Sequence, residues 1–222
     1  MKKVLNFLIL GPQVALLLIR FLIKPKDNTA IFKVSALRDH QAWDHAIEMS
    51  RQEPEVAKLM QERYLANPMH DLKQLDQLPD GTLGKEYARH MFQHQFSPDF
   101  YPRIGADTDL NYLRQRANES HDVWHVVTGI DVDEPGELKL LAVDLAQSHW
   151  PLAAFVIGAA FLVTTFRTPT RLGELGDAIA EGWMMGKKIK PLMAYKWEEM
   201  WHRPLIDIQQ ELGVTSIRKE LA

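Results

Sequence analysis

The chain has 222 residues, a length that suits one compact domain with a sizeable core, and its 46% hydrophobic and 25% charged residues are ordinary for a globular protein. A net charge of −3 argues against nucleic-acid binding, because no region has the basic excess that phosphate neutralisation requires. The absence of cysteine excludes thiolate ligands, disulfides, iron–sulfur clusters and cysteine nucleophiles, so any metal would depend on histidine and carboxylate side chains.

Residues 1–26 form an apolar segment flanked by basic residues. A membrane-spanning helix would need about 20 uninterrupted apolar residues, but Gly11, Pro12 and Arg20 interrupt this one, and no convincing signal-peptide cleavage site follows. Two short amphipathic helices on an anionic membrane surface fit the pattern better, although packing on the domain or at a dimer interface would also explain it. We therefore divide the chain into this segment and a helical domain, residues 27–222.

The next part of the chain, residues 31–96, is predicted to be helical. Pro54 suits the first turn of one helix, and Thr82 is a good N-cap for another that reaches Phe96. On the latter helix Glu86, His90 and His94 follow one face. Three such residues on a straight helix span about 12 Å, too far for one small ion, so we interpret them as a surface or dimer stripe.

A helix–turn–helix pair follows. The pattern predicts a helix over residues 109–128 that ends at Gly129, a turn over residues 131–136 rich in Asp, Glu, Pro and Gly, and a second helix from Glu137 to His149.

This pair carries the candidate metal site. His121 and His125 are four residues apart and share one helical face, with Asp122 beside them, and the returning helix brings Glu137 level with His125. These four side chains are a plausible divalent-metal site, in which the imidazoles favour Zn²⁺ and the carboxylates also permit Mg²⁺. A solvated polar face is the alternative, since His-x-x-x-His pairs are common in helices.

Residues 151–166 are nearly all apolar but too few to span a membrane, so they predict a buried core helix. The functional alternative is the wall of a groove for a long hydrocarbon, formed by Phe155, Gly158, Ala159 and Leu162. Further helices are expected over residues 175–185, 191–201 and 205–212. No strand pattern appears, and the fold class is therefore all-α, a single irregular multi-helix domain.

The spaced motif His121-Asp122-x-x-His125, followed by eleven residues and Glu137, resembles the signature of the coenzyme Q biosynthesis accessory family, the fourth Coq protein, in its bacterial form. The stretches LPDGTLGKEY (78–87), WHVVTG (124–129) and AQSHWP (146–151) agree with that family in the same order. The resemblance covers about residues 78–213. Asn118 departs from it, since many eukaryotic members have arginine there.

The resemblance implies a ubiquinone-biosynthesis protein that binds a prenylated aromatic intermediate at the metal site and catalyses oxidative decarboxylation of a polyprenyl hydroxybenzoate. The metal would face the polar head, Arg114 or Arg116 would meet an anionic group, and the apolar helix would hold the tail. One alternative is a non-catalytic, prenyl-lipid-binding scaffold that organises a quinone-biosynthesis complex. Another is a metal-dependent phosphohydrolase that acts on a prenyl phosphate.

The expected surroundings of the protein follow from the same resemblance and from the N-terminal segment. We expect peripheral contact with the cytoplasmic face of a bacterial membrane. The expected partners are a prenylated lipid or quinone precursor, a second copy of the chain in a homodimer, and other quinone-biosynthesis proteins.

Overall fold

The computed structural model describes residues 41–66 and 71–214, so the predicted amphipathic segment lies outside the described residues. Within them the chain forms α-helices and short 3-10 turns, with one isolated β-bridge between Thr82 and Pro204 and no strand. The all-α prediction is confirmed.

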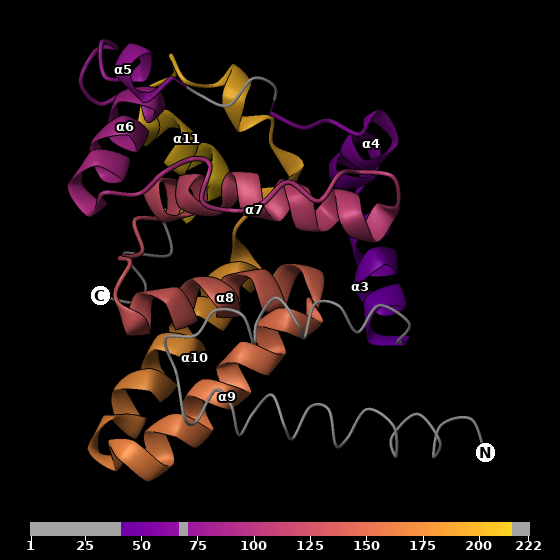
Figure 1. Cartoon of the computed structure of the whole chain (residues 1–222), viewed down its shortest axis with the longest axis vertical. Helices are drawn as coiled ribbons and strands as arrows, with labels where there is room; N and C mark the ends of the chain where they lie inside the picture. Colours follow the sequence, from indigo (N-terminus) through magenta and orange to yellow (C-terminus); the bar gives the residue numbers. More distant parts are fainter. Residues whose placement is uncertain (1–40, 67–70, 215–222) are drawn as a thin grey trace.

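The helices form two layers that face each other in Figure 1. One layer contains α4 (Pro54–Glu62), α5 (Leu72–Leu75), α6 (Leu83–His94), α7 (Asp109–Thr128) and α11 (Leu205–Leu212). The other contains α8 (Glu134–Ser148), α9 (Pro151–Arg167) and α10 (Leu172–Lys188). Helix α3 (Gln41–Gln52) contacts α7, α8 and α9 and so joins the layers along one side.

Local capping chemistry sets the ends of the two central helices. The side chain of Thr108 accepts a hydrogen bond from the Asn111 amide at the start of α7, and Gly129 ends that helix with φ of 62°. Helix α8 begins three residues before the predicted Glu137, because Asp133 accepts a hydrogen bond from the Gly136 amide at 2.9 Å and Pro135 occupies the first turn. The last three residues of the turn predicted over residues 131–136 therefore belong to the first turn of α8.

The prediction of a helix over residues 191–201 is wrong. This segment forms two 3-10 turns, η2 (Leu192–Ala194) and η3 (Trp197–Glu199). Tertiary contacts hold the segment in this form: the Leu192 amide donates to the Gln147 side chain at 3.0 Å, and the Tyr195 carbonyl, which a helix would pair with the Glu199 amide, accepts from Arg116 at 2.7 Å. The segment instead fixes the fully buried Trp197 in the core.

Helices α8 and α10 approach each other closely enough to require glycine. A Cβ atom on Gly182 would lie 2.1 Å from the carbonyl oxygen of Lys139, and one on Gly186 would lie 2.6 Å from that of Val143. These separations are far below van der Waals contact, so the two helices pack backbone to backbone. This contact fixes α8, which carries Glu137, to α10.

One helix invites comparison with a membrane span, because α9 is almost entirely apolar over its 17 residues. In the described part of the chain, however, no helix has both the length and the apolar character needed to cross a membrane.

Candidate metal centre and cavity

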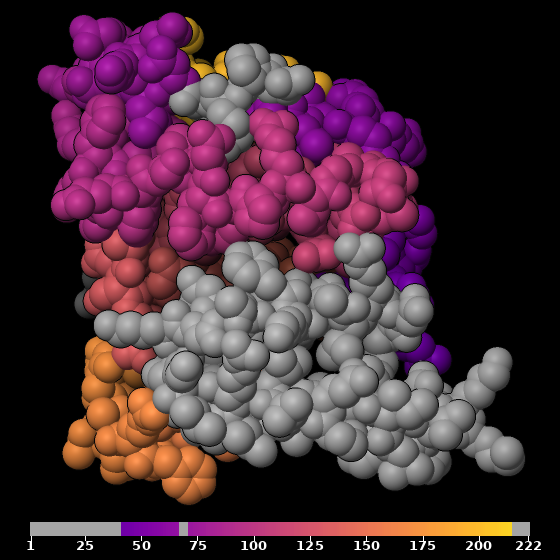
Figure 2. Space-filling model, in the orientation of Figure 1, coloured from indigo at the N-terminus to yellow at the C-terminus, as the bar shows by residue number. Residues whose placement is uncertain are grey.

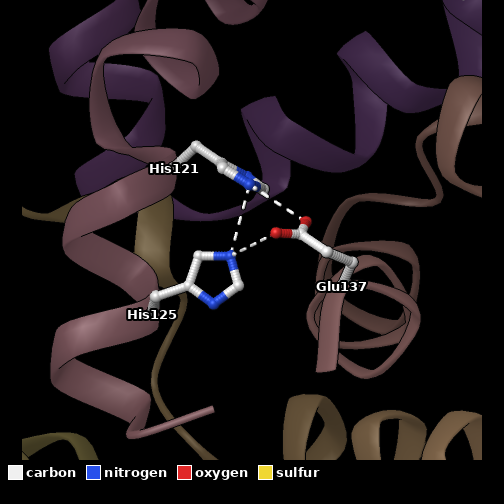
Figure 3. Close-up of side chains that lie close together, drawn as sticks. All are labelled: His121, His125 and Glu137. Atoms are coloured by element: carbon white, nitrogen blue, oxygen red, sulfur yellow. Dashed lines mark hydrogen bonds and ion pairs between the residues drawn. The ribbon is translucent and has the colours of Figure 1, made fainter. Parts of the chain in front are cut away.

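His121, His125 and Glu137 meet between the two layers, as Figure 3 shows. The two imidazoles project from successive turns of α7, and the carboxylate reaches them from the first turn of α8. The Nε2 atoms of the imidazoles are 3.3 Å apart; His121 Nε2 lies 3.3 Å from Glu137 Oε2, and His125 Nε2 lies 3.3 Å from Glu137 Oε1. Three residues thus bring two nitrogen and two oxygen atoms, of the kinds that bind divalent metals, close to one another.

A backbone contact orients the ring of His125. Its Nδ1 atom lies 3.0 Å from the carbonyl oxygen of Ile130, which follows the glycine that ends α7. A carbonyl only accepts hydrogen bonds, so Nδ1 carries the proton and donates. With Nδ1 occupied by this contact, Nε2 is the ring nitrogen that faces Glu137 and His121 and that would bind a metal. A metal-binding histidine usually has such a partner at its other nitrogen.

The electrostatics of the cluster favour a carboxylate anion next to imidazole. Burial alone would raise the pKa of Glu137, but hydrogen bonds and charge interactions with His121 and His125 lower it to about 2. Burial alone would lower the pKa of His121, but the carboxylates of Glu137, Asp122 and Asp144 outweigh burial and raise it. Both shifts favour a carboxylate anion beside a protonated imidazole, and a divalent cation would compete with that proton for the cluster.

The spacing within the cluster suits a small divalent cation. Zinc lies about 2.0–2.1 Å from histidine nitrogen and carboxylate oxygen, so neighbouring ligand atoms in a tetrahedral site are about 3.3 Å apart. The two imidazole Nε2 atoms have this separation, and each of them lies at the same distance from one of the two oxygens of Glu137. Two imidazoles and one carboxylate are also a donor set that zinc enzymes use when they leave a position open for substrate.

The cluster borders a cavity of about 840 Å³ that lies between the two layers. One wall of the cavity is the segment from the end of α6 to Tyr101. This part of the chain is magenta in Figure 2 and lies on the face of the molecule that the view shows. The polar side of the cavity comes from α7 and the start of α8. Its apolar side is formed by residues of α8, α9 and the loop between them: Leu138, Leu141, Trp150, Leu152, Val156, Ala160 and Val163.

The comparisons with known proteins identify the family of the chain. The family model described as "Coenzyme Q (ubiquinone) biosynthesis protein Coq4" matches residues 13–218. The chain belongs to the Coq4 family. It is 28% identical over 198 residues to the mitochondrial ubiquinone biosynthesis protein COQ4 homolog of Mus musculus, covering 88% of this chain and 70% of the mouse protein. The corresponding Homo sapiens protein is 29% identical over 204 residues, covering 88% and 74%.

A solved structure shows the same fold. The crystal structure of a candidate ubiquinone biosynthesis protein from Nostoc punctiforme superposes with a TM-score of 0.82 at 31% sequence identity. The match covers 92% of this chain and 98% of the Nostoc chain. The resemblance to the Coq4 family that the spaced histidine motif indicated is therefore confirmed, and the two-layer arrangement is shared with that protein.

The four predicted metal ligands are not all brought together in this Coq4 chain. Asp122 lines the cavity, but its carboxylate is not part of the cluster that His121, His125 and Glu137 form. Burial raises the pKa of Asp122, and the charge of Glu137 raises it further against the opposing effect of the two imidazoles. Asp122 is thus a neighbour of the cluster.

The two arginines predicted to bind an anionic head group have different environments. Arg114 lines the cavity, on the same face of α7 as Asn118 and His121. Arg116 is 1% exposed, and its guanidinium is held by Glu198 at 2.5 and 3.1 Å and by the Tyr195 carbonyl. Of the two, the structure brings only Arg114 to the cavity.

The predicted groove residues lie on α9, but the cavity uses a neighbouring stripe of that helix. The lining residues are Leu152, Val156, Ala160 and Val163. Of the predicted set, Ala159 is buried, Phe155 is partly buried, and Leu162 is 41% exposed. Gly158 is exposed, and a Cβ atom there would meet nothing within 4 Å. The stripe of α9 that lines the cavity is therefore displaced by about one residue from the predicted set.

His90 and His94 of α6 lie next to the cavity and the metal cluster, although they were predicted to form part of a surface or dimer stripe. His94 lines the cavity, and the His90 ring stacks on that of His125 with centroids 6.0 Å apart. Burial lowers the pKa of His90 to about 4, helped by the neighbouring imidazoles, so His90 is neutral at pH 7. The surface interpretation is wrong for these two residues, and Glu86 instead forms an ion pair with Arg89 at 2.6 Å.

Two further cavity residues, Tyr101 and Asp144, were missed by the sequence analysis. Tyr101 comes from the α6–α7 segment and places its ring 6.4 Å from that of His121; burial raises its pKa, so its hydroxyl stays protonated. Asp144 lies on α8, seven residues after Glu137. That spacing puts Asp144 on the same helical face as Glu137, so the sequence pattern could have predicted it. No local sequence pattern predicts the position of Tyr101.

Proposed function

We propose that this Coq4-family protein binds a prenylated aromatic intermediate of ubiquinone biosynthesis in the cavity and catalyses its oxidative decarboxylation with a divalent metal, zinc being favoured. The observation that carries the proposal is the position of the His121–His125–Glu137 cluster at the edge of a cavity whose opposite side is apolar. An amphiphile with an aromatic acid at one end and a polyprenyl chain at the other matches that division.

The polar side would hold the head group. His121, His125 and Glu137 would hold the metal, which would supply a Lewis acid that stabilises negative charge on the ring carboxylate. Arg114 lines the same cavity and would add a second cation for an anionic group. The protonated Tyr101 hydroxyl, next to His121, would act as a hydrogen-bond donor.

The apolar side would hold the tail. The walls supplied by α8 and α9 offer leucine, valine, alanine and tryptophan side chains without a charged group on α9. Each methylene-sized group that leaves water contributes about 0.8 kcal/mol, so several isoprene units would dominate the affinity. Binding of the tail would also exclude water from the head-group side.

The overall reaction requires an oxidant. Replacement of a ring carboxylate by hydroxyl consumes water and releases carbon dioxide, one proton and two electrons from the organic substrate. Dioxygen would accept the two electrons and, with two protons, leave as hydrogen peroxide.

The first prediction tests metal and turnover together. Purified full-length protein should contain about one divalent ion per chain, and it should convert a 3-polyprenyl-4-hydroxybenzoate to the hydroxylated product with release of carbon dioxide. His125→Ala should lose both properties, because it removes a buried ligand. His202→Ala is the matched control, since His202 is exposed and lies outside the cavity, and it should keep both.

The measurements are elemental analysis and product detection by mass spectrometry. Equal, near-zero metal content in the wild type and in His125→Ala would remove the metal site. Metal and lipid binding without turnover in the presence of dioxygen would instead favour the non-catalytic lipid-binding scaffold.

A further inference from the structure

Asp144 is a carboxylic acid in the cavity wall that has no part in the metal cluster. It lies two helical turns after Glu137 on the same face of α8, with Leu141 between them, and all three residues line the cavity. Each helical residue adds about 1.5 Å, so the Cα atoms of Glu137 and Asp144 are about 10 Å apart. Asp144 therefore marks a second polar point along the cavity.

Asp144 is not directly paired with a basic side chain in the described residues. Glu137 contacts the two imidazoles of the cluster, and Glu134 forms an ion pair with Arg171. Asp122 and Asp144 are influenced only by the charge of nearby imidazoles, both of them for Asp122 and His121 alone for Asp144. Asp144 accepts a hydrogen bond from Ser148 Oγ at 2.8 Å, on its own helix. In residues 41–66 and 71–214, no lysine or arginine forms an ion pair with it.

The surroundings of Asp144 suit a hydrogen-bond acceptor. Burial raises its pKa to about 6, opposed by the Ser148 hydrogen bond and the charge of His121, so the group is mostly ionised at pH 7. A second, small chamber of about 20 Å³, room for about one water molecule, adjoins Asp144 and is also lined by Gln147 and Ser148. An ionised carboxylate has about four acceptor positions, and Ser148 uses one of them.

We propose that Asp144 recognises a ring hydroxyl of the ligand by accepting a hydrogen bond from it, while the His121–His125–Glu137 cluster takes the ligand's anionic group. The proposal rests on the proposed function and narrows its ligand class. The two polar points are separated along one helix face, so the ligand is an aromatic acid that carries its acidic group and its hydroxyl on opposite sides of the ring.

The test is a thermodynamic cycle between protein and ligand. Full-length protein saturated with Zn²⁺ is titrated calorimetrically, in detergent micelles, with 3-geranyl-4-hydroxybenzoate and with 3-geranylbenzoate, which lacks the ring hydroxyl. For the wild type, loss of the hydroxyl should weaken binding about 10- to 100-fold, the range for a hydrogen bond to a charged group. For Asp144→Ala the two probes should bind within about threefold of each other.

Two further variants complete the cycle. Asp144→Asn keeps the shape of the side chain, guards against a folding defect in Asp144→Ala, and should show reduced discrimination because a neutral acceptor is weaker. Asp177→Asn is the matched control, an exposed aspartate on α10 outside the cavity, and should discriminate like the wild type.

The outcomes separate this inference from the proposed function. If the wild type binds the hydroxy acid and holds zinc, yet both Asp144 variants discriminate as well as the wild type, the role of Asp144 is refuted and the proposed function stands. If Asp144→Asn loses zinc, Asp144 is a metal ligand and the inference is overturned. If the wild type binds neither probe, the proposed function and the inference fall together.

Discussion

At the scale of single residues, the buried charges of this protein are controlled by their immediate partners. Arg116 is almost fully buried, and the carboxylate of Glu198 and the Tyr195 carbonyl accept hydrogen bonds from the two terminal nitrogens of its guanidinium. Asp144 is desolvated without a cationic partner that would lower its pKa below the usual value. The first arrangement stabilises the fold, whereas the second keeps a carboxylate available at a cost in stability.

The second prediction concerns the stability of the variant Asp144→Asn, which removes this cost. The pKa of Asp144 rises from 3.8 in the unfolded chain to about 6 in the folded protein, so the folded state binds the proton more tightly. The stability that this provides is complete below about pH 4 and is lost as the pH rises through 6. In chelator-treated protein, Asp144→Asn should be more stable than wild type at pH 8 by about 1–3 kcal/mol, and the difference should vanish near pH 4.

Urea unfolding at both pH values measures the effect, with the exposed Asp177→Asn as the control. A difference between Asp144→Asn and the wild type that is the same at pH 4 and pH 8 would show that Asp144 titrates normally.

At the scale of the helices, close packing of α8 on α10 makes a third prediction. Gly182→Ala would place a Cβ atom 2.1 Å from the Lys139 carbonyl oxygen, so the helices must separate, and the variant should lose about 1–3 kcal/mol or more of stability. Gly176→Ala is the matched control on the same helix. Its Cβ atom would meet nothing within 4 Å, and it should gain about 0.4–1 kcal/mol through the unfolded state. Thermal unfolding of the two variants should therefore shift in opposite directions, and equal shifts would contradict the close contact.

The fourth prediction concerns the face of α9 that holds the tail. Ala160 lines the cavity, whereas Gly158 is exposed on another face. Ala160→Leu should weaken binding of a long-tailed prenyl hydroxybenzoate about tenfold or more relative to the tail-free acid, because the larger side chain occupies the space of the tail. Gly158→Leu should leave this dependence on tail length unchanged, and metal content should be normal in both. The reverse pattern would move the tail to the stripe of Phe155, Gly158, Ala159 and Leu162 that the sequence predicted.

The helices show which features the sequence carries locally. Thr108 and Gly129 define α7 within its own sequence, so both of its ends were predictable. The His121–His125 spacing and the return of Glu137 are also local and gave the cluster. The 3-10 turns after Pro191 depend on Gln147 and Arg116, which are distant in sequence, and no pattern near Pro191 records them. The burial of Arg116 against Glu198, 82 residues away, was unpredictable for the same reason.

At the scale of the whole molecule, the site lies where two differently stabilised layers meet. Helices α8, α9 and α10 share a core cluster of their own around Leu138, Ala142 and Leu175. A larger cluster, which includes Trp124 of α7 and Val143 of α8, joins this layer to the other one. The cavity lies beside these contacts and is lined by residues of both α7 and α8. The function proposed here therefore depends on the relative position of the layers.

The division of the ligands between the layers links two binding equilibria. The imidazoles belong to α7 and the carboxylate to α8, while the apolar wall for the tail moves with α8. A cation bound to both helices would fix the distance between the layers and therefore the width of the cavity. If that width suits the lipid, the cation and the lipid should each raise the binding affinity of the other by the same factor, typically 5- to 150-fold. Zinc titrations with and without 3-geranyl-4-hydroxybenzoate, and lipid titrations with and without zinc, should return equal factors. The protein would then retain its metal most firmly when substrate is present.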